Sequence, residues 1–122
     1  MDNQTQTIDR GDWAAFAEDF SKQHAGETAT LEMVGTDVGD QYAVQNLPFV
    51  GMTLESKGSD AGSLVLMLGT EGDKNMERFI AGPKSLKVHV TPEGETIVEI
   101  EAADEPTLLL HLMPLTALPA PQ

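Results

Sequence analysis

The sequence predicts an α+β domain, in which an N-terminal helix packs on an antiparallel sheet of five to six strands. Two patterns support this fold class. Apolar side chains recur at helical spacing between residues 12 and 24, and apolar and polar side chains alternate in three short stretches between residues 85 and 113. Alternation with a period of two is typical of half-buried strands, and three such strands in succession indicate an antiparallel meander.

The predicted helix begins after an N-cap at Asp12, with Asp9 as the alternative, and ends near His24, where Gly26 supplies a left-handed stop. Its apolar face is formed by residues three or four positions apart: Trp13, Phe16, Ala17, Phe20 and His24. Because an isolated helix of this length is marginal in water, we expect this face to pack against the sheet.

Several strands are expected between the helix and the meander. The alternating or apolar stretches are residues 28–34, 49–55 and 63–68, and the last of these is apolar on both faces. Residues 42–46 read as extended, but Asn46, Leu47 and Pro48 are expected to interrupt any strand there. Residues 75–81 fit either a helical turn or a short strand. The sheet is expected either to stay open or to curl into a small barrel.

The first hairpin of the meander has a predicted register. Pro92 and Gly94 fit a three-residue loop, because Pro presets the first turn position and Gly accepts a left-handed conformation. This loop sets Val88 opposite Val98, and it sets His89 opposite Ile97. A slip of one residue would exchange the apolar and polar faces, so the turn and the hydrophobic pattern agree.

The predicted domain limits follow from composition. Residues 1–8 are polar and expected to be disordered, residues 9–113 form a single α+β domain, and residues 114–122 form a Pro-rich mobile tail. The first residues lack the basic and apolar regions of a signal peptide, and no apolar run approaches the ~20 residues of a membrane-spanning helix. A cytoplasmic location without membrane association is therefore expected.

The charge balance disfavours several partners. The chain of 122 residues has 20 acidic and 7 basic residues, for a net charge of −13. Nucleic acids and anionic membranes would be repelled by most of such a surface. There is no cysteine, which excludes disulfides, thiolate metal sites and a cysteine nucleophile.

A family resemblance rests on a loose set of residues spread over most of positions 12–112. They are Trp13, Phe16, Phe20 and Ser21 with His24 and Gly26, then Thr30-Leu31-Glu32, Leu47-Pro48-Phe49 with Gly51, Ile80 with Pro83, and Val98-Glu99-Ile100. With these residues the chain resembles a bacterial family known only as a domain of unknown function. The resemblance implies the domain limits and no activity. In outline, a helix followed by short strands is also similar to Sm-like and SH3-like barrels, which is an analogy of fold alone.

No catalytic residue, metal site or cofactor is predicted. His24 is expected to cap the end of the helix, where a cation favours the helix dipole. His89 and His111 both flank Ile97 on adjacent strands, so two strand spacings of about 4.8 Å separate their backbones. That separation is awkward for two ligands of one zinc ion, so surface histidines are the better interpretation.

Two functions remain open. The outward face of the meander carries Ile97, Leu109 and Met113, although a solvated face should be mostly polar. The leading hypothesis is a non-enzymatic protein-interaction or self-associating domain, with a homodimer built on this face or on an exposed sheet edge. The alternative is a small-ligand-binding module or modest enzyme with its site between helix and sheet, near Trp13, His24 and Tyr42.

Overall fold

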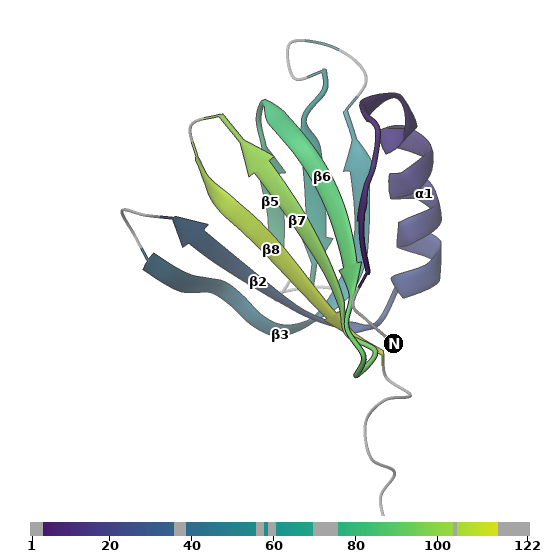
Figure 1. Ribbon diagram of the computed structural model, residues 1–122, viewed down its shortest axis with the longest axis vertical. Helices are drawn as coiled ribbons and strands as arrows, with labels where there is room; N and C mark the ends of the chain where they lie inside the picture. The colour runs from purple at the N-terminus through teal and green to yellow at the C-terminus, as the bar shows by residue number, and fades with distance from the viewer. Residues whose placement is uncertain are drawn as a thin grey trace, which may run out of the picture.

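Ten elements of secondary structure follow one another in a computed structural model, which describes residues 4–35, 39–55, 58, 61–69, 76–103 and 105–114 (Figure 1). In chain order they are β1 (Gln4–Thr7), the 3-10 turn η1 (Arg10–Asp12), α1 (Trp13–His24), β2 (Thr28–Gly35), β3 (Gly39–Leu54), β4 (Leu64–Leu68), β5 (Met76–Ile80), β6 (Pro83–Val90), β7 (Thr96–Ala102) and β8 (Glu105–Met113).

The eight strands form one antiparallel sheet in the order β1-β6-β7-β8-β2-β3-β4-β5. One helix with an antiparallel sheet confirms the α+β class, but the expectation of five to six strands is wrong. The sheet also stays open: among the described residues, β1 and β5 are its two ends and do not pair with each other. It nevertheless folds into two layers, because β3 pairs with β2 through its first part and with β4 from Phe49 onward.

The predicted meander is confirmed. β6 and β7 pair with Val88 opposite Val98 and His89 opposite Ile97, as the loop chemistry requires. The loop closes through hydrogen bonds from Gly94 N to Thr91 O (3.0 Å) and from Thr91 N to Glu95 O (2.9 Å), and Gly94 has a φ of 92°. β8 continues the sheet on the other side of β7.

β3 does not stop at residues 46–48, contrary to the expectation of an interruption. Asn46 adopts a left-handed φ of 61°, and the β2–β3 register shifts between Ala29 and Glu32. These bulges add residues to β3 and bend it, so the strand continues into the rear layer. β5, for which a helical turn was the alternative, is a strand that pairs regularly with β4.

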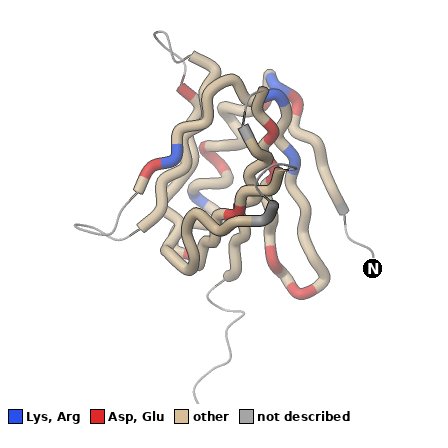
Figure 2. The backbone as a smooth tube through the Cα atoms, turned by 90° about the vertical axis from the view of Figure 1, so that its left-hand side faces the viewer, with Lys and Arg blue, Asp and Glu red and all other residues tan. Residues whose placement is uncertain are grey.

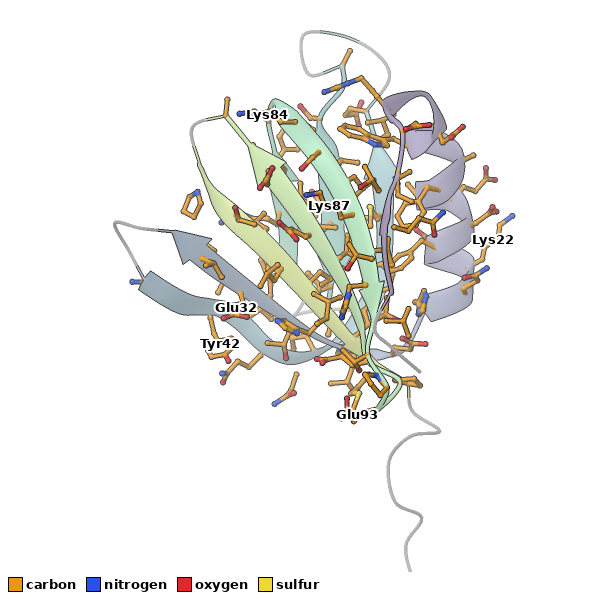
Figure 3. All side chains as sticks on the ribbon, viewed as in Figure 1. Lys22, Glu32, Tyr42, Lys84, Lys87 and Glu93 are labelled. Carbon is orange, nitrogen blue, oxygen red and sulfur yellow. The ribbon has the colours of Figure 1, made fainter. Side chains whose placement is uncertain are left out.

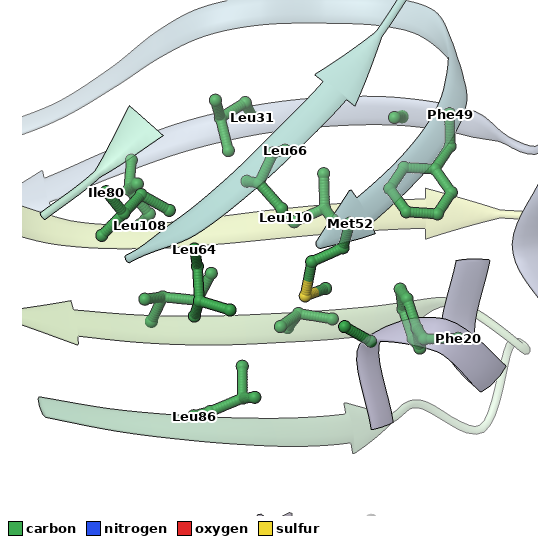
Figure 4. Packing of buried hydrophobic residues seen from close by; sticks show 14 of the residues in the cluster. Phe20, Leu31, Phe49, Met52, Leu64, Leu66, Ile80, Leu86, Leu108 and Leu110 are labelled. Atoms are coloured by element: carbon green, nitrogen blue, oxygen red, sulfur yellow. The ribbon is translucent and has the colours of Figure 1, made fainter. Parts of the chain in front are cut away.

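The core lies between the two layers, and α1 closes one side of it (Figures 1 and 4). The helix buries Trp13, Ala17 and Phe20, as its spacing predicts. Phe20 packs edge-on against Phe49 at 5.7 Å between ring centres. The buried side chains alternate along β7, whereas β4 buries three residues in succession, Leu64 to Leu66. The core includes Leu31, Leu66, Leu86, Ile100, Leu108 and Leu110.

A single hydroxyl joins the helix to β3. Ser21 Oγ accepts a hydrogen bond from Met52 N (2.8 Å) and lies 2.8 Å from Ala17 O and 3.0 Å from Met52 O. Gly51 permits this approach, because a Cβ there would lie 3.2 Å from Ser21 Oγ. Both residues belong to the set that carries the family resemblance, and their proximity gives that pattern a structural reason.

Residues 4–8 are held against the domain, although they belong to the segment expected to be disordered, and residues 1–3 of that segment lie outside the described residues. β1 pairs with β6, and Ile8 N donates to Leu86 O (2.9 Å). The Trp13 indole N–H donates to Ile8 O (2.8 Å), and the Arg10 guanidinium lies 4.5 Å above the same ring. A polar strand of four residues therefore gains its order from β6 and Trp13. Most of the tail expected at residues 114–122 lies outside the described residues.

Candidate functional site

The front layer of the sheet has a surface that points away from the core, and we call it the outer face. It is formed by the residues that alternate with the buried ones: Lys87 and His89 on β6, Ile97 and Glu99 on β7, Leu109, His111 and Met113 on β8, Thr28, Thr30 and Glu32 on β2, and Tyr42 on β3. Within the described part of the chain, α1 packs on β3 and no element crosses this face (Figure 1).

One end of the outer face is hollowed. The hollow has a volume of about 340 Å³ and is lined by Thr28, Thr30, Tyr42, Asn46, Glu95, His111 and Met113. Its position follows from the backbone, because the bulges of β3 lie opposite Ala29–Glu32 of β2. Asn46 has a left-handed backbone conformation, and its backbone N–H donates to Thr30 Oγ1 at 3.2 Å.

His111 lies between two carboxylates at the edge of this hollow. Its Nε2 is 2.9 Å from Glu32 Oε1, and its Nδ1 is 3.0 Å from Glu95 Oε2. All three side chains are largely buried: the exposed fraction is 22% for His111, 12% for Glu32 and 31% for Glu95. A carboxylate can only accept, so both contacts are hydrogen bonds when both ring nitrogens carry protons. The geometry can therefore accommodate an imidazolium with one carboxylate at each ring nitrogen.

Each member of the cluster is placed by a different element. Glu32 comes from β2 and stands next to Tyr42, its partner on β3 (Figure 3). Glu95 ends the β6–β7 loop, and its amide donates to Thr91 Oγ1 at 3.1 Å. His111 comes from β8, between Thr30 on one side and Ile97 on the other.

The outer face and its hollow carry mainly acidic side chains. Glu32 and Glu99 lie on the face, Glu95 lines its hollow, and Glu101 extends the face two residues beyond Glu99 on β7. Lys87 is its basic residue among the strands described. Acidic residues also outnumber basic ones over the chain as a whole, and Figure 2 marks both kinds along the described backbone. Lys87 lies on β6, away from the Glu32 side of the face (Figure 3).

The three residues expected to line a ligand site are not brought together. Trp13 fills the core and is 2% exposed. His24 lies at the other end of the helix, about 16 Å away along its axis, where it contacts Glu27 at 2.8 Å and Phe20 at 4.3 Å between ring centres. Tyr42 is 57% exposed and belongs to the hollow of the outer face.

The helix and the sheet do enclose a second hollow, with a volume of about 380 Å³. It is lined by Ala14, Ala17, Glu18, Ser21 and Lys22 of α1 and by Met52, Thr53 and Leu54 of β3. None of Trp13, His24 and Tyr42 lines it, and its only charged groups, Glu18 and Lys22, contact each other at 3.7 Å on the surface.

The three apolar residues proposed for an interface do share the outer face. Ile97 stands opposite His111, Leu109 stands between Glu99 and Glu32, and Met113 stands beside Thr28. All three are partly buried. The face therefore combines an apolar strip with carboxylates on both sides.

Sequence reasoning missed Glu32, Glu95 and the hollow itself. The sequence indicated that His111 lies beside Ile97 on the outward face. It did not indicate that β2, which carries Glu32, is the strand on the other side of β8. Among the described residues, no group of three or more histidine, aspartate or glutamate side chains is arranged to hold a metal ion. No helix in the described ranges combines the length and apolar character needed to cross a membrane.

The comparisons with known proteins bear on the family alone. No curated protein and no solved structure matches the chain. One family model matches residues 4–121, which is nearly the whole chain and includes the helix, the sheet and the outer face. The chain therefore belongs to DUF5335, a family of unknown function.

Proposed function

We propose that this chain is a non-enzymatic interaction domain that binds a partner protein through the outer face. The observation that carries the proposal is an uncovered sheet face on which Leu109 and Ile97 lie among carboxylates, beside a hollow. A face that only contacts water is usually polar, whereas apolar patches rimmed by polar residues are typical of interaction sites.

The charges of the face indicate the chemistry of the partner. If two copies of the chain met on this face, the acidic group of one copy would face the acidic group of the other. That group consists of Glu32, Glu95, Glu99 and Glu101. Like charges placed opposite each other oppose association. A segment of another protein with alternating apolar and basic side chains complements the face better, so we favour it over a homodimer.

A capped pentapeptide of alternating lysine and leucine residues is a suitable probe. Titrated into the labelled protein, it should shift backbone amide NMR signals of β2, β7, β8 and the first part of β3. Leu109→Ser should weaken binding at least tenfold, because it removes the central apolar contact without changing the charge. Val50→Ser is the matched control, since Val50 is 50% exposed on the other part of β3.

Several outcomes would contradict the proposal. Shifts spread evenly over the surface, or equal effects of Leu109→Ser and Val50→Ser, would indicate nonspecific attraction to an acidic protein. Light scattering over a concentration series tests the homodimer separately. A stable dimer whose amide shifts map to the outer face would favour self-association over a basic partner.

A small cationic molecule is the second candidate for the same face. It is favoured by the hollow, whose volume lies at the lower end of the range for ligand sites and whose wall includes Tyr42 and Met113. A ligand at a hundred times its dissociation constant stabilises a protein by about 2.7 kcal/mol, so a thermal-shift screen of amines tests this candidate. Hits that Tyr42→Ala abolishes would support it.

A further inference from the structure

We infer that a basic side chain of the partner enters the hollow in exchange for the proton of His111. The inference rests on the proposed function, because it describes how the outer face would take up a basic segment. The observation behind it is the pair of contacts at 2.9 and 3.0 Å that hold the two ring nitrogens between Glu32 and Glu95.

The bound proton balances part of the charge at the hollow. With the imidazolium in place, the cluster of two carboxylates and one cation has a net charge of −1. When His111 loses the proton, one ring nitrogen becomes an acceptor and faces a carboxylate that can no longer accept from it. The cluster then has a net charge of −2 and one carboxylate without its donor.

An entering ammonium or guanidinium group satisfies that carboxylate. Glu95 is the more accessible of the two, with 31% of its side chain exposed against 12% for Glu32. The new cation repels the imidazolium beside it, because both groups are positively charged. The two groups also compete for the same carboxylate oxygen atoms. Binding of the basic side chain and protonation of His111 therefore oppose each other, and by linkage this effect is reciprocal.

Among the described residues, the hydrogen bonds of the His111 ring go to Glu32 and Glu95. Its direct neighbours across the strands are Ile97 and Thr30, and Tyr42 lies in the wall of the hollow. Glu99 faces Leu109, two residues further along the strands, and is a diagonal neighbour of His111. His89 lies beyond Ile97 on β6, where its Nδ1 is 2.7 Å from Thr5 Oγ1.

Calorimetric titration of the whole chain with the lysine–leucine pentapeptide tests the exchange. Run near pH 6.5, where an ordinary imidazole is about half protonated, the binding heat should vary with the ionisation heat of the buffer in the sense of proton release. The apparent affinity should fall as the pH is lowered from 8 to 5, approaching tenfold per pH unit for one linked proton.

Two variants assign the proton. His111→Gln should abolish the dependence on buffer and on pH, whereas His89→Gln, on the same face, should keep both. If His111→Gln fails to fold, NMR titration of the histidine ring protons in the unaltered protein provides the same information. The peptide should move the titration midpoint of His111 to lower pH and leave those of His24 and His89 in place.

The outcomes separate this inference from the function on which it rests. Binding at the outer face without proton release, or with proton release that persists in His111→Gln, would overturn the exchange and leave the interaction domain intact. No binding of the peptide at any pH would overturn both.

Discussion

Glu32 and His111 make contact diagonally across two strands. Glu32 Oε1 lies 2.9 Å from His111 Nε2, although the residue opposite Glu32 on β8 is Leu109 and the residue opposite His111 on β2 is Thr30. Diagonal neighbours in a sheet are ~7–8 Å apart at the backbone, a distance that two long polar side chains can bridge. The contact thus fixes β2 to β8 on the solvent side, while the leucines fix them on the core side.

Replacing Glu32 by alanine should destabilise the fold. The substitution removes a hydrogen bond made by a charged carboxylate and leaves His111 with one partner, so the free energy of unfolding should fall by about 1.5–3 kcal/mol. Urea denaturation measures this change. Glu99→Ala on the same face is the control, and its effect should stay within about 0.5 kcal/mol. Equal losses in the two variants would show that the contact with His111 has no special weight.

Ser21 and Gly51 should show coupled effects on stability. Ser21→Ala leaves the Met52 amide without its partner, which costs about 1–3 kcal/mol. Gly51→Ala places a Cβ 3.2 Å from Ser21 Oγ, so it should also destabilise the protein. When Ser21 is already alanine, that close contact is gone. The double variant should therefore be more stable than the sum of the single effects predicts, by at least about 0.5 kcal/mol. Strict additivity would refute the contact.

Phe20 should be a costly side chain to remove from the helix. It is 3% exposed and packs against both Phe16 and Phe49. Phe20→Ala should lower the free energy of unfolding by about 3–5 kcal/mol, because it leaves a cavity at the helix–sheet contact. Phe79→Ala on β5 is the control, since Phe79 is 44% exposed. An unchanged melting temperature for Phe20→Ala would exclude the packing described.

Trp13 should control the attachment of the N-terminal strand. Trp13→Phe keeps an aromatic ring in the core but removes the hydrogen bond to Ile8 O. The Ile8 amide, which donates to Leu86 O, should then exchange with solvent roughly two- to tenfold faster than global unfolding explains. Phe16→Leu serves as the comparison, because it alters the helix without touching the strand. Equal exchange at Ile8 in both variants would contradict the role of Trp13.

The parts of the fold that depend on local chemistry could be predicted from the sequence. The β6–β7 hairpin follows from Pro92, Gly94 and the alternation around them, and the helix follows from the spacing of its aromatic residues. β1 could not be predicted, because its four polar residues have no apolar pattern of their own. The sequence divides β3 into two segments at residues 46–48. The strand continues there because Asn46 adopts a left-handed conformation and its backbone N–H donates to Thr30 Oγ1 on β2.

The same distinction applies to the outer face. Its apolar residues were predicted, because Ile97 and Leu109 belong to the meander and their direction follows from the hairpin register. The contact between His111 and Glu32 needs the pairing of β8 with β2, strands separated by most of the chain. Pairings of that kind are decided by tertiary packing, so the carboxylates around His111 became visible only in the folded domain.

The pairing of β1 with β6 has a consequence for how the chain acquires its fold during synthesis. Thr5 and His89, which touch in the finished sheet, are 84 positions apart. At ribosomal rates of 5–20 residues per second, roughly 4–17 s pass between the appearance of the first strand and that of its partner. Throughout this interval the four residues of β1 have no strand to pair with, and their polar character keeps them from recruiting a wrong one. β1 can therefore take its place in the sheet only after β6 has been synthesised.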